Sequence, residues 1–153
     1  MEQAPSGAPI LASWGRRFAA ILIDNLLLVV PAAVGILLIS LDNFNDGISP
    51  VAVVGLLILG LTLTVGHAAY FTILNGNERG QTYGKRALGI RVIDLREGGR
   101  IGYGRSFARW AVPFVINLIF GFFFLIDDLW PLWDSRNQAL HDKFANSIVV
   151  CVQ

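Results

Sequence analysis

The chain has 153 residues, of which 54% are hydrophobic and only 15% are charged, and its formal net charge is +1. This composition excludes an intrinsically disordered chain and excludes nucleic-acid binding through bulk positive charge. The single cysteine, Cys151, excludes an intrachain disulfide and a metal site built from several thiolates.

The first segment, Met1–Ser13, is short and polar, and Pro, Gly and Ala are frequent in it. It is predicted to be a disordered tail (1–13) ahead of a single membrane domain (14–153). Arg16 and Arg17 before an apolar run resemble the charged start of an export signal. The run that follows has 24 residues, more than the roughly 7–15 of a cleavable signal core, so we expect an uncleaved first span.

Three long apolar stretches decide the fold class, and together they contain only two charged residues. They are Phe18–Leu41, Val51–Leu74 and Phe107–Ile126, with 24, 24 and 20 residues. At about 1.5 Å per helical residue they reach roughly 36, 36 and 30 Å, against a hydrocarbon core of about 30 Å. The sequence therefore predicts an all-α integral membrane protein with three transmembrane helices (spans 18–41, 51–74 and 107–126).

Basic residues are distributed unevenly between the connections of these spans. The first connection, Asp42–Pro50, has no Lys or Arg, whereas the second, Asn75–Ser106, has seven. Because basic residues favour the cytoplasmic side, the N-terminus and the second connection are predicted to be cytoplasmic. Three crossings would then place the C-terminus outside. Lys85, Arg86 and Arg91 of the second connection are expected to contact anionic lipid headgroups, so membrane lipids are predicted partners.

Two strand-like segments leave it undecided whether the third apolar region crosses the membrane. Leu88–Val92 alternates like a half-buried strand, and Ser147–Val152 is also strand-like. If they pair, the third apolar region must turn back as a re-entrant hairpin, with Pro113, Asn117 and Gly121 as candidate breaks. The sequence favours a single crossing, with a β-hairpin-like cytoplasmic loop around Gly98-Gly99 and an amphipathic segment at Asn137–Asn146 on the membrane surface.

Three separated motifs, in this order, resemble the RDD family of small membrane proteins. They are Arg16-Arg17 seven to eight positions before Asp24, the segment Gly80–Asp94 (GQTYGKRALGIRVID), and Ala139–Lys143 (ALHDK) before an apolar end. The family is named for one arginine and two aspartates. Arg17 and Asp24 match the first two by position, and Asp142 is the choice for the third, with Asp127 or Asp128 as alternatives.

The resemblance implies a compact multi-span module of a bacterial inner (cytoplasmic) membrane. It also implies a tentative link to the transport of unidentified ligands, or attachment to larger membrane assemblies. It does not define an activity.

Asp24 is the most informative single position, because an ionised carboxylate inside a bilayer costs a few kcal/mol and needs a partner. Counting residues from the span ends places Asp24 and His67 at similar depths, roughly 9–10 Å below the cytoplasmic boundary. We expect an Asp24–His67 contact, supplemented by Arg109 or Asn117, as a polar cluster within the membrane. Such a cluster either serves as a proton relay or only fixes how the helices pack.

Two functions remain open from the sequence. One is transport of a small cation, proton or other solute by a homo-oligomer, since three spans are few for a pathway. The other is a non-catalytic accessory or assembly subunit of a larger membrane complex. Neither a nucleophile with an adjacent base nor metal-ligand spacing occurs, so we expect no enzymatic activity, no metal and no cofactor, and nucleic acid is not an expected partner.

Overall fold

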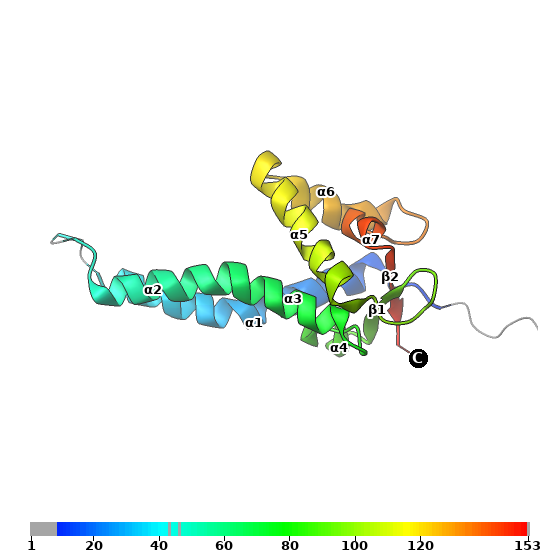
Figure 1. The fold of residues 1–153 in the computed structure, drawn as a ribbon, viewed down its shortest axis with the longest axis horizontal. Helices are drawn as coiled ribbons and strands as arrows, with labels where there is room; N and C mark the ends of the chain where they lie inside the picture. Colours follow the sequence, from blue (N-terminus) through cyan, green and yellow to red (C-terminus); the bar gives the residue numbers. More distant parts are fainter. Residues whose placement is uncertain (1–8, 43, 46, 153) are drawn as a thin grey trace, which may run out of the picture.

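The computed structural model describes residues 9–42, 44–45 and 47–152. Two long helices run side by side, and the remaining elements gather around one end of this pair (Figure 1). The α-helices are α1 (Trp14–Ser40), α2 (Pro50–Leu61), α3 (His67–Gly76), α4 (Tyr83–Ala87), α5 (Gly102–Phe120), α6 (Phe123–Leu129) and α7 (Leu140–Phe144). The strands are β1 (Ile90–Asp94) and β2 (Ser147–Cys151), and two short turns of other helix types are η1 (Thr62–Gly66) and η2 (Trp130–Leu132).

The first two predicted spans form as membrane-length helices. Trp14–Ser40 and Pro50–Gly76 have 27 residues each, and both are long and apolar enough to cross a bilayer. Only 11% of the most apolar window of each helix is buried inside the protein, so their side chains face outward. The core helix of a soluble protein would be mostly buried by its neighbours. The exposed apolar side chains of these two helices therefore suit a lipid environment.

Small residues allow α1 and α2 to pack closely at the end of the pair that is distant from the sheet. Ala32 and Gly35 of α1 are buried, as are Ala52 and Gly55 of α2. A Cβ built on Gly35 would lie 2.8 Å from the carbonyl oxygen of Gly55, and one on Gly55 would lie 2.7 Å from that of Gly35. The two backbones are therefore in direct contact, as is typical of membrane helix pairs.

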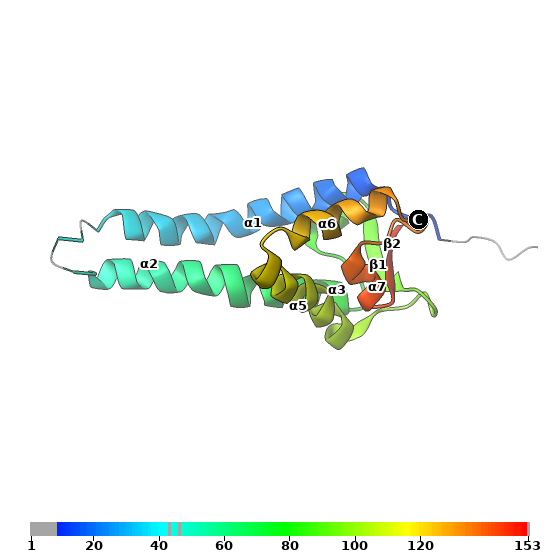
Figure 2. The same ribbon diagram turned by 90° about the horizontal axis from the view of Figure 1, so that it is seen from above.

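The third apolar region does not form a third crossing, which corrects the prediction for 107–126. Gly121 has φ 70° and ends α5, and α6 then returns toward the end of the molecule where α5 began (Figures 1 and 2). Only glycine adopts this backbone without strain, so Gly121 is the break among the three candidates. The helical hairpin that the sequence left open as the alternative, with its break at Gly121, matches the course of this region.

The small sheet explains why the chain must return. β1 pairs antiparallel with β2, from Ile90 opposite Cys151 to Asp94 opposite Ser147. The C-terminal strand therefore lies beside the second connection, and the expectation that the two lie on opposite sides of the membrane is wrong. The expected local hairpin is also wrong, since Gly98 and Gly99 form a tight turn after β1 while the partner strand comes from the chain end.

Part of the predicted disordered tail belongs to the fold. The backbone N–H of Ala12 donates to Val149 O at 2.9 Å, and that of Cys151 donates to Ile10 O at 2.8 Å. Ala12 is fully buried, with Ile90, Val92 and Val149, in the small core below α1. The prediction for 1–13 is thus wrong for residues 10–12, and residues 1–8 lie outside the described part of the chain.

The predicted amphipathic segment is shorter and oriented differently. Within Asn137–Asn146 only Leu140–Phe144 is helical, and Phe144 is exposed. Its buried side is formed by Asp142 with the flanking Ala139 and Ala145. This segment therefore places a carboxylate inside the protein rather than an apolar face on the membrane.

Candidate functional site

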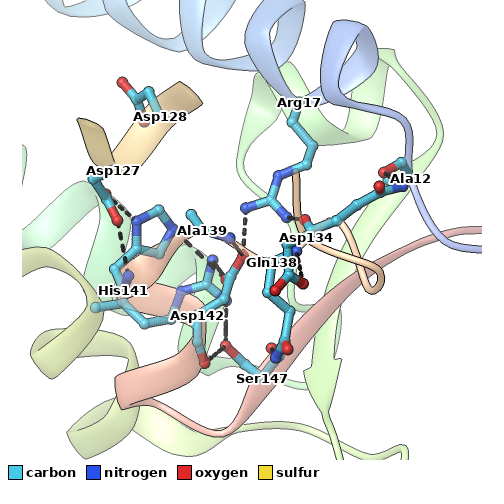
Figure 3. Close-up of polar contacts among 12 residues, drawn as sticks. Ala12, Arg17, Asp127, Asp128, Asp134, Gln138, Ala139, His141, Asp142 and Ser147 are labelled. Atoms are coloured by element: carbon cyan, nitrogen blue, oxygen red, sulfur yellow. Dashed lines mark hydrogen bonds and ion pairs between the residues drawn. The ribbon is translucent and has the colours of Figure 1, made fainter. Parts of the chain in front are cut away.

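Two arginines from different helices share one buried carboxylate. Arg17 of α1 pairs with Oδ2 of Asp142 (Figure 3). Nη2 of Arg109 of α5 lies 2.5 Å from Oδ1 of the same aspartate. Asp142 is fully buried. Burial alone would raise the pKa of this carboxyl, but the guanidinium groups of Arg109 and Arg17 outweigh it and hold the pKa well below its usual range.

Further hydrogen bonds fix this triad, Arg17–Asp142–Arg109, in place. The backbone N–H of Ala139 donates to Asp142 Oδ2 at 3.1 Å, and Arg109 Nη1 donates to Ser147 Oγ at 3.0 Å. Arg17 also donates to the carbonyl oxygen of Asn137. The triad thus joins α1, α5, α7 and β2 at one end of the long helices.

A second acid–base pair lies beside the triad. The ring Nδ1 of His141 is 2.5 Å from Asp127 Oδ2, and the backbone N–H of His141 donates to Asp127 Oδ1 at 2.9 Å (Figure 3). The neighbouring Asp128 accepts through its backbone carbonyl from Trp14 Nε1 at 2.8 Å. These contacts hold α6 against α7 and the start of α1.

Asp24 has a different environment from the expected one. Its carboxylate accepts from Tyr70 OH at 2.6 Å, from Thr82 Oγ1 at 2.6 Å and from the backbone N–H of Gly84 at 2.7 Å. The side chain is 1% exposed, so these three donors replace its hydration. Asp24 fastens the loop after α3 to α1, and the expected direct contact with His67 is wrong.

The other three members of the expected cluster also have partners of their own. His67 Nδ1 accepts from Trp110 Nε1 at 2.7 Å, and Arg109 belongs to the triad. The backbone carbonyl of Asn117 accepts from the N–H of Gly121 at 2.7 Å, where α5 ends. His67, Arg109 and Asn117 nevertheless line one cavity, and Asp24 does not.

This cavity has a volume of about 400 Å³ and lies between α1, α3, α5 and α6. A volume of this size is typical of small-molecule sites. Its polar end contains Arg17, Asn75, Lys85, Ser106, Arg109, Asp127 and His141, and the lining also includes the polar residues Asn25, His67, Asn117 and Asp128. Its apolar walls contain Trp14, Phe18, Ile21, Leu63, Phe71, Trp110, Phe114 and Phe124.

Lys85 is turned into the protein, which corrects its expected contact with lipid headgroups outside it. It is 9% exposed, lines the cavity, and its Nζ donates to Asn75 Oδ1 at 2.6 Å. Burial lowers its pKa to about 7, and the nearby positive charge of Arg109 acts in the same direction. Its neighbour Arg86 is exposed, so its contact with headgroups stays a prediction, whereas Arg91 is half-buried in β1.

Sequence reasoning therefore missed Asn75, Tyr70 and the place of Lys85 in the cavity lining. Asn75 had a visible signal, because it is a polar residue at the end of the second apolar run. Lys85 had none, since a lysine among other basic residues ordinarily marks a solvated surface.

The family model for the "RDD family" matches residues 11–146. A protein named "Proline-rich antigen homolog" from Mycobacterium tuberculosis (strain ATCC 25618 / H37Rv) is 30% identical over 117 residues, which cover 72% of this chain and 47% of that protein. The "Proline-rich antigen" of Mycobacterium leprae (strain TN) is 27% identical over 150 residues, or 88% of this chain and 59% of that protein. The chain thus spans about half the length of these relatives. No solved structure matches it significantly.

Proposed function

The chain belongs to the RDD family of membrane proteins, and from this premise we propose that it is a transport protein. It binds a proton or a small solute in the cavity between α1, α3, α5 and α6 and moves it across the bilayer. The observation that supports this most directly is Lys85, a buried amine at the cavity wall whose hydrogen-bond partner is a neutral amide. Buried ionisable groups in membrane proteins are costly and usually serve a pathway or a binding site.

The charges in the cavity limit what it accepts. Arg17, Lys85 and Arg109 line it together with Asp127 and Asp128. Because both arginines are paired with Asp142, Lys85 is the one of these three cations that forms no ion pair in the described part of the chain, and it would disfavour a metal cation beside it. Among the described residues, no group of three His, Cys, Asp or Glu side chains is placed to hold a metal ion. A proton, or a solute that offers acceptor oxygens, therefore fits better than the small cation that the sequence also allowed.

Transport in this proposal requires several copies of the chain. Two crossing helices and a re-entrant hairpin do not surround a continuous pathway, and many transporters are assembled from paired repeats. Large apolar side chains along α1 and α2, such as Leu26, Val30 and Leu57, are exposed and suit contacts with lipid or with another copy.

We further propose an inner-membrane location with the N-terminus, the second connection and β2 in the cytoplasm. The seven basic residues of Asn75–Ser106 support this orientation. The pairing of β1 with β2 extends it to the C-terminal strand.

Proton flux into proteoliposomes tests transport, with an entrapped pH-sensitive dye as the readout. Under an imposed membrane potential we expect wild-type protein to exceed empty vesicles, and Lys85→Met to fall to the leak rate. Arg86→Gln is the matched control, because it removes an adjacent but exposed positive charge. Wild-type flux equal to that of empty vesicles would contradict proton movement.

The exposed apolar surface of α1 and α2 also favours a second function, that of an accessory subunit docked on a larger membrane complex. Purification in a mild detergent separates the two. A stoichiometric unrelated partner supports the accessory role, and a homogeneous homo-oligomer supports the transporter.

A further inference from the structure

We infer that the cavity binds a membrane phospholipid, with the phosphate at the end formed by Lys85, Arg17 and Arg109 and an acyl chain along the aromatic walls. The inference rests on the proposed function in that it names the ligand class of the same cavity. Its binding measurement is separate from flux, so the two can fail independently.

Lys85 provides the strongest argument for a phosphate. An ammonium group has three N–H donors, and in the described part of the chain one is used, toward Asn75 Oδ1. Lys85 is 9% exposed and lines the cavity, so the other two N–H groups are left for a molecule inside the cavity. A ligand with several acceptor oxygens inside the cavity would complete the donor set and offset the cost of the buried charge.

In the described part of the chain Lys85 forms no ion pair, and its side-chain partner is the neutral amide of Asn75. Arg17 and Arg109 share the single carboxylate of Asp142. The nearby carboxylates are directed to other groups, because Asp127 contacts His141 and Asp24 accepts from Tyr70, Thr82 and Gly84. Asp128 lines the wall formed by α6, which keeps the site from being uniformly positive. An oxyanion next to Lys85 would therefore supply the direct charged partner that the described residues do not give it.

The shape and lining of the cavity argue for a chain attached to that oxyanion. The lining follows the second long helix from Asn75 to Leu63, twelve residues or about 18 Å. Away from the polar end the walls are mainly aromatic. Phe18, Phe114 and Phe124 line the cavity and are still 42%, 38% and 47% exposed, so its apolar part continues onto the outer surface. A free phosphate would leave this apolar part unfilled.

Detergent-solubilised full-length protein tests the inference by native mass spectrometry and by thermal unfolding with added ligand. The probes are phosphatidylglycerol, a diacylglycerol with the same chains, and inorganic phosphate. We expect a 1:1 adduct per chain and a raised Tm with phosphatidylglycerol alone. Equal binding of the diacylglycerol would overturn the role of the phosphate, and equal stabilisation by inorganic phosphate would overturn the role of the chain.

Matched variants separate the cavity from surface attraction. Lys85→Met should weaken phosphatidylglycerol binding by about tenfold or more, the loss expected for a charged hydrogen bond of roughly 1.5–3 kcal/mol. Arg86→Gln should bind like the wild type. Unchanged binding by Lys85→Met, or equal losses in both variants, would overturn the cavity site.

A second pair of variants keeps the test decisive if Lys85→Met does not fold. Leu63→Trp narrows the apolar end without touching the buried charges, and Val65→Trp adds the same bulk on the same π-helical turn outside the cavity lining. We expect weaker lipid binding only in Leu63→Trp, and equal binding in both would overturn the inference. Proton flux without lipid binding would contradict the lipid site but not transport. Lipid binding without flux would contradict transport but not the lipid site.

Discussion

Arg17 in the first turns of α1 pairs with Asp142 of α7, 125 positions later in the chain. Because Arg109 of α5 pairs with the same carboxylate, this contact joins the first long helix, the re-entrant hairpin and the C-terminal segment. The start of α1 and α7 are thereby fixed to each other at the end of the molecule that also holds the sheet (Figure 1). The cavity is open beside this junction, so its shape depends on the junction being intact.

Replacing Asp142 by Asn should strongly destabilise the protein. The substitution leaves the two buried guanidinium groups without their shared counter-charge, and breaking a buried pair in this way costs about 3–5 kcal/mol. Unfolding by heat or by denaturing detergent in mixed micelles measures the loss. Glu78→Gln is the control, because Glu78 pairs with Arg100 while the two side chains are 79% and 54% exposed, and such pairs contribute about 0–1 kcal/mol. Similar losses in the two variants would show that the triad does not hold the fold together.

Gly84→Ala should detach the second connection from α1. A Cβ at position 84 would overlap the carbonyl oxygen of Ala20 and approach Cγ of Asp24 to 2.9 Å. The backbone would have to move, and the hydrogen bond from the Gly84 N–H to Asp24 would be lost, at a cost of about 2 kcal/mol or more. Protection of the Gly84 and Lys85 amides against hydrogen exchange measures this detachment. Gly104→Ala in α5 meets no atom within 4 Å and should leave protection unchanged or slightly higher.

The two long helices could be predicted from the sequence because bilayer thickness sets a minimum length that Phe18–Leu41 and Val51–Leu74 satisfy. Length could not decide the third region. A 20-residue apolar run permits one crossing, and only the pairing of Ile90–Asp94 with the chain end forces it to turn. That pairing is a contact between distant segments, which the alternating pattern of each strand suggests but does not specify.

The prediction of a direct Asp24–His67 contact was wrong for a related reason. Counting residues gives the depth of a side chain but not which neighbour reaches it. Tyr70, three positions after His67 and thus on nearly the same face of α3, supplies the contact instead. The role of Lys85 was beyond prediction, because the fold of the loop from Asn75 to Lys85 turns a basic residue inward.

The topology of the sheet predicts that the C-terminus and the second connection lie on the same side of the membrane. Reporter proteins fused after Val152 and inserted in the turn at Gly98 should both be active only in the same compartment. Both sites are exposed, so the insertions should leave the fold intact. The same reporter inserted after Gly47, in the first connection, should report the opposite side. A C-terminal signal matching that of Gly47 would restore the three-crossing topology and contradict the pairing of β1 with β2.

The buried Lys85 predicts a stability that increases with pH. Burial lowers its pKa to about 7 from the ordinary value of 10.5, so between these values the unfolded chain holds one more proton than the folded protein. Stability then rises as the pH increases from 7 toward 10.5, by at most about 1.4 kcal/mol per pH unit, and below pH 7 this group adds no further change. Lys85 donates a hydrogen bond to the neutral side chain of Asn75. The charged groups that affect its pKa are Arg109, Asp24, Asp142 and Arg17.

The difference in Tm between wild type and Lys85→Met, measured from pH 6 to pH 10, isolates this contribution from all other titrating groups. We expect the wild type to gain relative to the variant above pH 7, and Arg86→Gln to follow the wild type. A bound phospholipid should remove the difference, because a phosphate beside the ammonium favours the protonated lysine and raises its pKa toward the ordinary value. Parallel curves for wild type and Lys85→Met without lipid would mean that Lys85 is hydrated in solution, and the cavity would then lack the buried amine on which lipid binding depends.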